Sequence, residues 1–472
     1  MISGENGILN RAVEAKERNE YASNLEYLQT KAYEAIAEYY SNGSTDSESE
    51  YILKKFNDSN IVADINTGVV KYNGKTYDIS EIIGKTNEQE AIESQTDVKL
   101  KQITKSNATG RNAELFETGK IRMIIQEIND ESLRTVIPNG FYYVTGAPST
   151  GLVISDKFGD DDNNSKGGNQ FVWVPCEGTN TASYEKTNDE SIKNKFGLAS
   201  SWARYSSNSI NYNEYKDWTD YGGDQKSVQK YGGFYVARYE AGVPKNATFY
   251  SNTDGAKYIS EKSIIEDDYK PVSKKNNQVW NQIYQKTAII LSERMYKESE
   301  AVKSQLIDSY AWDTILDWMT KEIPTIGDDS TGYGNYYNSG IKFTNSLYAI
   351  HQYGNDWIAA STYKKGNGIA TAYTELATGV TIASSCNVKN KIKNIYDMAG
   401  NVWEWTTEVG NHSSEWELLT KEQAENALYA VIRGGSFYEK GSRYQVSFRH
   451  GYNTISTGRG IDAGFRVVLY IK

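Results

Sequence analysis

The chain has 472 residues, which exceeds a single hydrophobic core and predicts two or more folding units. Its net charge of −10, with no basic stripe in the sequence, argues against a nucleic-acid-binding protein that neutralises phosphates through a basic surface. Two cysteines and three histidines are too few for a dense disulfide framework or a histidine-rich metal centre, and no run approaches the roughly 20 apolar residues of a membrane span.

The first 42 residues are predicted to form one amphipathic helix. Leu25, Leu28 and Ala32 recur at spacings of three and four, with polar residues between them. A short helix is expected at 51–56, and strands are expected on both sides of the Asn73-Gly74 hairpin signal. We therefore expect residues 1–83 to form a small unit of one long helix and a hairpin.

Residues 84–134 are polar, with little hydrophobic periodicity except at 121–125, and are expected to form a connector with some local structure. From residue 135, short apolar runs such as 140–144, 152–154 and 171–174 alternate with Gly, Asn and Asp clusters, which is typical of short strands joined by irregular loops. Two helices are expected among them, at 278–304 and 310–321. The acidic run 160–164 is expected to be a solvated loop, with cation binding as the alternative.

Three C-terminal motifs indicate the type of domain. Residues 394–406 read NIYDMAGNVWEWT, residues 431–437 read VIRGGSF, and residues 464–467 read GFRV. In this order they resemble the signatures of the formylglycine-generating enzyme, or sulfatase-modifying factor, family. The resemblance covers about residues 136–472. It implies an α+β domain with the C-type-lectin-like fold at residues 135–472.

The opening residues carry a second resemblance. Residues 2–12, ISGENGILNRA, are similar to the segment that follows the hydrophobic anchor in prepilin-like surface proteins of Gram-positive bacteria. The resemblance implies a pilin-like α/β-hairpin unit at 1–83, with pilus subunits among its partners. It also implies display at the cell surface or outside the cell, through an N-terminal membrane anchor that this chain lacks. A plain N-terminal helix is the alternative.

The first C-terminal motif has the residues of a cation site. Asp397 and Glu404 place carboxylates on either side of a turn centred on Gly400, and Ca²⁺ prefers carboxylate and carbonyl oxygens. The family resemblance implies a structural calcium site formed by Asp397, the carbonyls of Gly400 and Val402, and Glu404. The family often has Asn at the first of these positions. Alternatively, both acids only hydrogen-bond the turn while the two tryptophans of the motif lie in the core.

The family's oxidase activity requires two copper-binding cysteines shortly after the RGGSF motif. The matching positions here are Glu439 and Tyr444, and neither side chain can supply a thiolate. Cys176 and Cys386 match neither position, and three dispersed histidines do not form the iron site of the related sulfoxide synthases. The resemblance therefore implies a protein that is not an enzyme.

The segment 437–462 is rich in Tyr, Ser, Asn, Gly and Arg, the composition of adaptable binding loops. Its position resembles the variable region in target proteins of diversity-generating retroelements. We therefore expect a receptor-type protein that binds a protein or glycan ligand on another cell, a phage or a host surface. The expected ligand-binding residues are Tyr438, Tyr444, Val446, Ser447, Phe448, His450, Tyr452, Asn453, Thr454, Ser456, Arg459 and Asp462.

Retroelement diversification replaces adenines, mostly in Asn codons, and so cannot produce Glu, Lys or Gln. Glu439, Lys440 and Gln445 are accordingly expected to be fixed. Three alternatives stay open: an ordinary polar loop, an enzyme with non-oxidase chemistry that uses acids such as Glu439, and a structural minor pilin. Convergent titratable groups in a pocket would favour the enzyme, and burial of the segment 438–462 would favour the pilin.

Overall fold

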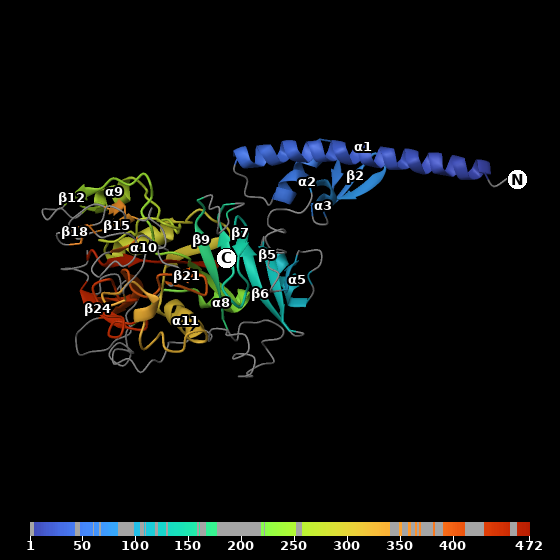
Figure 1. Ribbon diagram of the computed structural model, residues 1–472. Coiled ribbons are helices and arrows are strands. Elements are labelled where there is room, and N and C mark those ends of the chain that lie inside the picture. Colours follow the sequence, from blue (N-terminus) through green and yellow to red (C-terminus); the bar gives the residue numbers. More distant parts are fainter. Residues whose placement is uncertain are drawn as a thin grey trace. The chain divides into compact units, whose positions relative to one another are not determined.

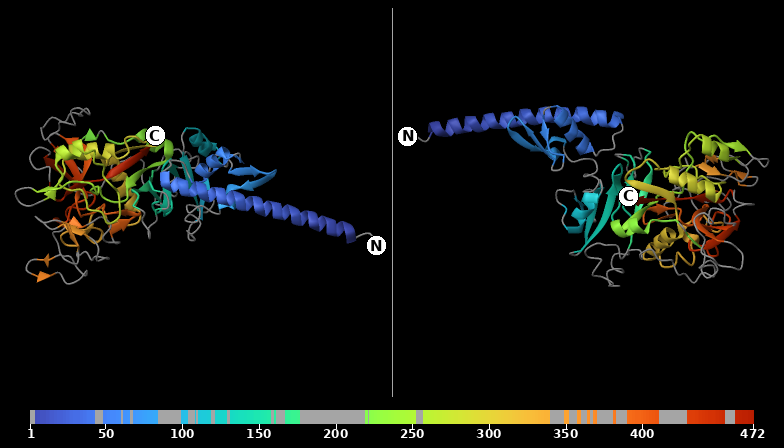
Figure 2. Two further views of the ribbon diagram at one scale, coloured as in Figure 1. Left: turned by 90° about the horizontal axis from the view of Figure 1, so that it is seen from above. Right: turned by 180° about the vertical axis from the view of Figure 1, so that it is seen from behind.

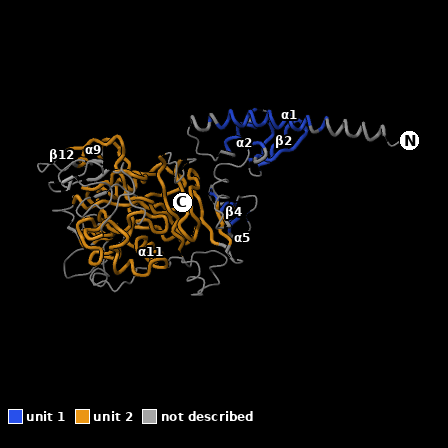
Figure 3. Tube along the Cα trace, viewed as in Figure 1, with its two compact units in different colours: residues 1–97, 102–122 blue, residues 98–101, 123–472 orange. Residues whose placement is uncertain are grey.

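The structure, a computed structural model, divides into two compact units: residues 1–97 with 102–122, and residues 98–101 with 123–472 (Figure 3). The expected domain boundaries at 83 and 134 do not coincide with this division. The residues that the structure describes are 4–42, 48–59, 61–65, 68–83, 99–103, 108, 110–118, 121–128, 131–157, 160, 167–176, 219–220, 222–251, 257–339, 349–351, 357–359, 364–365, 368–369, 381–382, 390–410, 429–453 and 460–472.

The first unit consists of a long helix on a small antiparallel sheet (Figures 1 and 2). Leu28 and Ala32 of the long helix are buried together with Phe56 and Tyr77. The hairpin turns at Asn73-Gly74 with positive φ at both residues, as a type I′ turn requires. The expected helix and hairpin are confirmed. The elements are α1 (Gly4–Asn42), α2 (Glu48–Asp58), β1 (Val62–Ala63), β2 (Val69–Tyr72), β3 (Lys75–Asp78) and α3 (Ile79–Ile83).

The predicted connector contains more regular structure than the sequence indicated. Strands β4 (Lys99–Ile103), β5 (Ile121–Ile128) and β6 (Glu131–Pro138) form a three-stranded sheet, and α5 (Gly110–Thr118) joins the first two. Val136 and Ile137 are buried on adjacent positions of β6, so this strand has no exposed face. Because both faces are covered, its sequence shows no alternation to recognise.

An antiparallel sheet of six strands forms the main part of the core of the second unit. Its central strands are buried along their whole length, which explains their continuous apolar runs. The expected strands at 140–144, 152–154 and 171–174 are confirmed within a few residues. The strand order is β14 (Val302–Leu306), β26 (Val467–Ile471), β11 (Gly233–Ala237), β9 (Gln170–Pro175), β8 (Val153–Ser155) and β7 (Tyr142–Thr145).

A second sheet brings the three C-terminal motifs together. Its longest strand, β22, pairs antiparallel with β10 and β23 and parallel with β25. The first motif leads into β22, the second ends β23, and the third runs from β25 into β26 of the six-stranded sheet. The strands are β10 (Thr219–Asp220), β22 (Trp403–Gly410), β23 (Tyr429–Arg433), β24 (Arg449–Asn453) and β25 (Ala463–Phe465).

The second unit also contains the expected helix at 310–321, which is α11 (Ser309–Thr320), capped by the Asp308 carboxylate. The prediction of one helix over 278–304 is wrong, because only α10 (Gln285–Arg294) forms there. Val279 and Trp280 precede it as buried loop residues, and Gln282 has a φ of 54°, which a helix does not allow. The other helices are α8 (Gln225–Tyr231), α9 (Glu261–Glu266) and the short 3₁₀ turn η1 (Thr331–Tyr333).

Short paired strands complete the described part of this unit: β12 (Tyr250–Ser251) with β13 (Lys257–Tyr258), β15 (Ala349–His351) with β16 (Trp357–Ala359) and β19 (Thr381–Ile382), β17 (Lys364–Lys365) with β18 (Gly368–Ile369), and β20 (Lys391–Ile392) with β21 (Ile395–Tyr396). Asp160 is buried and accepts hydrogen bonds from Ser155 and Gln170, so its expected solvation is corrected. Residues 161–164 of that loop lie outside the described residues. Among the described helices, none combines the length and the apolar character that crossing a membrane requires.

Candidate functional site

The site lies where the chain leaves β23, loops through residues 434–448 and returns as β24. The two strands pair with Ile432 opposite His450 and Arg433 opposite Arg449. Parallel pairing of β25 with β22 places Ala463 beside Trp403. Both ends of the segment 437–462 therefore lie next to the start of β22.

The glycines of the RGGSF motif allow the loop to begin. Gly434 and Gly435 have φ values of 94° and 74°, which L-residues rarely adopt. A Cβ at Gly435 would clash with the main-chain oxygen of Tyr444. The carbonyl of Gly434 accepts hydrogen bonds from the Gly400 amide at 2.8 Å and the Tyr336 hydroxyl at 2.6 Å. The second motif is thereby joined to the turn of the first.

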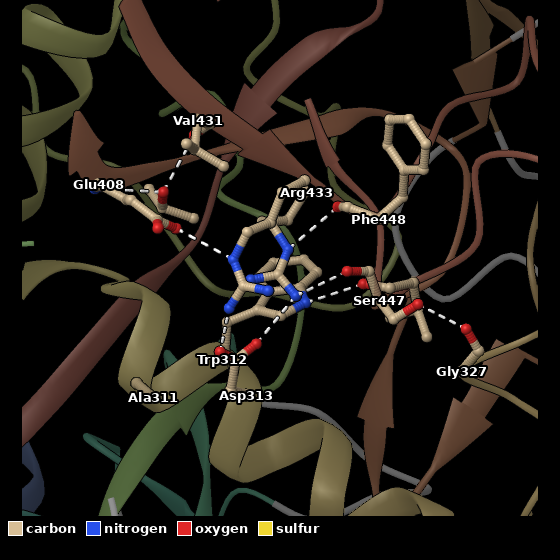
Figure 4. Close-up of polar contacts among 12 residues, drawn as sticks. Ala311, Trp312, Asp313, Gly327, Glu408, Val431, Arg433, Ser447 and Phe448 are labelled. Atoms are coloured by element: carbon tan, nitrogen blue, oxygen red, sulfur yellow. Dashed lines mark hydrogen bonds and ion pairs between the residues drawn. The ribbon is translucent and has the colours of Figure 1, made fainter. Parts of the chain in front are cut away.

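A buried network of charged side chains supports the part of the loop that leads into β24 (Figure 4). Arg433 Nη2 lies 2.9 Å from Asp313 Oδ1, and Arg449 forms ion pairs with Asp313 and Glu408. The Arg433 guanidinium also lies 5.4 Å from the ring centroid of Trp312. Burial lowers the pKa of Arg433 to about 10, while Asp313 and Glu408 oppose the shift.

The same network fixes the main chain of residues 446–448. Arg433 donates to the carbonyls of Ser447 and Phe448, each at 3.1 Å (Figure 4). The Trp312 indole donates to the Val446 carbonyl at 3.0 Å, and the Ser330 hydroxyl accepts from the Val446 amide at 2.9 Å. Because these hydrogen-bond partners are themselves buried, they hold the main chain of residues 446–448 in one conformation.

The opposite side of the loop carries an aromatic cluster around the Trp403 ring. The ring centroids of Tyr444, Phe448 and His450 lie 5.8, 6.1 and 5.6 Å from that of Trp403. Trp403 itself is buried, whereas the other three side chains are half-buried. Figure 4 shows the Phe448 ring directed away from the Arg433 network. We call these four residues the Trp403 cluster.

Two carboxyl groups adjoin the Trp403 cluster. The Ser436 hydroxyl hydrogen-bonds Glu439 and lies 3.5 Å from Asp462 Oδ2, and the Trp403 side chain lies close enough to Glu439 to lower its pKa. Burial and the charge of Asp462 raise the pKa of Glu439, although the hydrogen bond from Ser436 and the Trp403 side chain oppose this. Burial also raises the pKa of Asp462. Both groups therefore resist ionisation more than an exposed carboxyl does.

The two positions expected to replace the family's cysteines, Glu439 and Tyr444, lie together in the structure. Glu439 interacts with the Trp403 side chain, and the Tyr444 ring contacts the same indole. Main-chain bonding from the Tyr444 amide to the Lys440 carbonyl closes the turn between them. Cys176 is buried at the end of β9, and Cys386 lies outside the described residues. Within the described residues, no group of three or more His, Cys, Asp and Glu side chains is arranged to hold a metal ion.

The expected calcium residues occupy a buried turn at the start of β22. Asp397 and Gly400 have φ values of 55° and 72°, and Asp397 accepts from the Asn390 amide at 2.9 Å. Glu404 is buried and accepts two hydrogen bonds from Arg466 Nε and a third from Nη2. The carbonyl of Asp397 accepts from the same guanidinium at 3.1 Å.

Glu240 is a third carboxylate of this turn, and the sequence interpretation missed it. It accepts from the Asn401 amide at 2.6 Å and lies 3.3 Å from the Val402 amide nitrogen. Burial, followed by the charges of Asp397 and Glu404, raises the pKa of Glu240 well above its ordinary value. Glu240 follows the conspicuous Gly-Gly-Phe-Tyr strand β11, which was the only available signal.

The structure sorts the expected ligand-binding residues into three groups. Tyr438 is exposed, and Tyr444, Phe448, His450 and Asp462 are half-buried. Val446 and Ser447 are fully or almost fully buried, and the Ser447 hydroxyl donates to the Gly327 carbonyl. The expectation that these two contact ligand is therefore corrected, because they belong to the supporting layer. The side chains of Tyr452 and Asn453, and all of Thr454, Ser456 and Arg459, lie outside the described residues.

Part of the chain matches a known family. Residues 327–471 match the family described as the sulfatase-modifying factor enzyme 1-like domain. The C-terminal region contains such a domain. The matched stretch of this sulfatase-modifying-factor-like domain ends in β26, which pairs with β11 and β14 in the six-stranded sheet. Strands from residues 142–306 thus complete the folded unit around the matched stretch, and the expected α+β fold class is confirmed.

Two solved structures overlap with part of the chain. PvdO from Pseudomonas aeruginosa is 14% identical, with a TM-score of 0.25, and the overlap covers 51% of this chain and 81% of that protein. Treponema denticola variable protein 1 is 13% identical, also with a TM-score of 0.25, and the overlap covers 51% of this chain and 85% of that protein. A search of curated protein sequences finds no match.

Proposed function

We propose that the sulfatase-modifying-factor-like domain is a non-catalytic ligand-binding domain whose binding face is the Trp403 cluster with Tyr438 and its neighbours. The supporting observation is the division of one loop into two sides. Buried Arg433 and Trp312 hold its main chain, while Tyr444, Phe448 and His450 stay half-buried on the other side. Such a scaffold tolerates changes in the outer side chains without moving the backbone.

The replaced cysteine positions support a non-catalytic role. Glu439 and Tyr444 flank the same indole, so the pair of sites that would hold copper thiolates carries an acid and a phenol instead. Neither group is a soft copper ligand, and neither performs thiol oxidation.

The proposed ligand is a protein or a glycan on another cell, a phage or a host surface. Aromatic side chains with small polar neighbours suit both ligand types. In this proposal the first unit, with the long helix α1, is the pilin-like part that follows a membrane anchor and contacts pilus subunits. Retroelement diversification of the segment 437–462 would then change outer residues such as Tyr444 and His450 and leave Arg433, which precedes the segment, unchanged.

A structural calcium ion at the first motif is part of the proposal. Glu240, Asp397 and Glu404 are buried, and Glu404 pairs with Arg466. The charges of Asp397 and Glu404 raise the pKa of Glu240, a repulsion that a divalent cation would offset. Carboxylate oxygens have enough lone pairs to accept from an arginine and still bind a metal. Asp397, Glu404 and the carbonyls of Gly400 and Val402 would hold the ion, and bound calcium would neutralise this charge.

An acid–base enzyme is the second candidate. The shared Ser436 hydroxyl and the raised pKa values of Glu439 and Asp462 favour it, because carboxyl groups of this kind serve as general acids. A panel of chromogenic esters and glycosides would test this candidate: turnover by the full chain that Glu439→Gln abolishes would support the enzyme and contradict the binding proposal.

The binding proposal is tested with the full chain on an array of defined glycans and purified surface proteins. We expect at least one specific interaction, lost in the Tyr444→Ala/Phe448→Ala variant and retained in the matched control Lys440→Ala, whose side chain is exposed in the same loop. Equal thermal unfolding of the variants would exclude misfolding as the cause. Interactions that persist in the double variant, or copper-dependent oxidation of a cysteine peptide by the wild type, would overturn the proposal.

A further inference from the structure

The two carboxyl groups beside the Trp403 cluster have no cationic partner among the described residues. Glu439 interacts with the hydroxyl of Ser436, the indole of Trp403 and the charge of Asp462. Asp462 interacts with Ser436 and with its own main chain. Asp313 and Glu404, by contrast, are buried acids that pair with arginines. Two neighbouring carboxylates without such a partner repel each other.

The adjacent aromatic side chains present rings that attract cations. The Tyr444 ring already has one over it, since the Arg443 guanidinium lies 5.2 Å from its centroid. Arg443 is exposed and extends from the outer surface of the loop. Phe448 and His450 continue the half-buried aromatic surface from Tyr444 across Trp403. Aromatic faces with nearby carboxylates are the usual environment of bound ammonium groups.

We infer that the Trp403 cluster, with Glu439 and Asp462, binds an organic cation: an ammonium or guanidinium group of the ligand. This inference rests on the proposed binding function and specifies the chemistry of the same face. The cation contacts the aromatic rings and neutralises the carboxylate pair, which has no cationic partner within the described part of the chain. The net charge of −10 favours the approach of such ligands.

Arg443 has a defined part in this arrangement. Its guanidinium lies where an incoming cation would contact the Tyr444 ring, so it competes for that ring. Removal of any positive charge from the loop weakens the long-range repulsion of a cationic ligand, so this general effect should be similar for each basic residue there. Lys440 is exposed in the same loop and is therefore a matched control for Arg443.

The test is calorimetric titration of the full chain with choline and with 3,3-dimethylbutan-1-ol, which has the same shape without the charge. Butylammonium and butylguanidinium form two further arms, which distinguish lysine-like from arginine-like ligands. We expect the charged probes to bind and the neutral alcohol to bind at least about tenfold more weakly. Glu439→Gln and Tyr444→Leu should each weaken binding of the cations by about tenfold. Arg443→Ala should strengthen it more than Lys440→Ala does.

Equal binding of choline and its neutral analogue would overturn the inference, as would cation binding that both Glu439→Gln and Tyr444→Leu leave unchanged. Failure of this inference is separable from failure of the proposed function. If an array ligand requires Tyr444 and Phe448 but no cation competes with it, the binding face stands and its cationic chemistry is refuted. If nothing binds in either experiment, both are refuted.

Discussion

Arg433 and Asp313 form a fully buried ion pair, with 2.9 Å between Nη2 and Oδ1. Asp313 belongs to α11 and Arg433 ends β23, so the pair joins the helix to the strand from which the candidate binding loop departs. Asp313 also forms an ion pair with Arg449, which begins β24. One carboxylate therefore pairs with an arginine from each of the two strands that border the loop.

Asp313→Asn should destabilise the second unit strongly, because two buried guanidinium groups would lose their shared carboxylate. Loss of one partner from a buried pair typically costs about 3–5 kcal/mol. The free energy of unfolding is measured by urea denaturation of the full chain, monitored by tryptophan fluorescence. Asp328→Asn changes an exposed acid after the same helix and should stay within about 0.5 kcal/mol of the wild type. Similar midpoints for both variants would show that the network is unimportant for stability.

Glu439→Cys/Tyr444→Cys should create a copper site. Both positions flank Trp403, and two thiolates there would form a soft ligand pair for Cu(I). We expect the double variant to retain one equivalent of Cu(I) in competition with a chelating dye, and each single variant to retain none. If the double variant behaves as the single variants do, the two positions do not correspond to the family's cysteines.

Calcium should raise the melting temperature of the full chain, and chelation should lower it again. Ligand present at about 100 times its Kd stabilises a protein by about 2.7 kcal/mol. Asp397→Gly removes the carboxylate without backbone strain, because φ is 55° at this position, and should abolish the calcium-dependent shift. Asp397→Asn keeps one side-chain oxygen and should retain part of the calcium-dependent shift in melting temperature. A melting temperature that is insensitive to both calcium and chelator would refute the site.

Stability should depend on pH through Glu439. Its pKa is raised on folding, so the folded state binds this proton more tightly than the unfolded state. The resulting stabilisation is complete below the ordinary carboxyl pKa and is lost as pH rises through the raised value. Glu439→Gln should therefore lessen the decline in melting temperature from pH 4 upward, whereas Glu266→Gln, at an exposed acid on α9, should not. A steeper decline in Glu439→Gln would contradict the direction of the shift.

The local order of the sequence was enough to predict much of the architecture. Alternating three- and four-residue spacings identified α1, and Asn73-Gly74 identified the hairpin β2–β3, because both depend on contacts between near neighbours in the chain. Three ordered motifs identified the domain type, which the match over residues 327–471 confirms. The same reasoning failed at 278–304, where helical spacing was overridden by burial of Trp280 in the core.

Only the tertiary structure could separate supporting from exposed residues in the candidate site. Val446 and Tyr444 belong to one loop of similar composition, yet one is buried under Trp312 and the other lies half-buried on Trp403. The same holds for Glu439 and Asp462, which are distant in sequence and meet at Ser436 because β25 pairs parallel with β22. The sequence by itself determined the domain type and the position of the candidate loop, because both follow from local motifs. Which side each one faces, and which charges lack a partner, depends on strand pairings between distant segments.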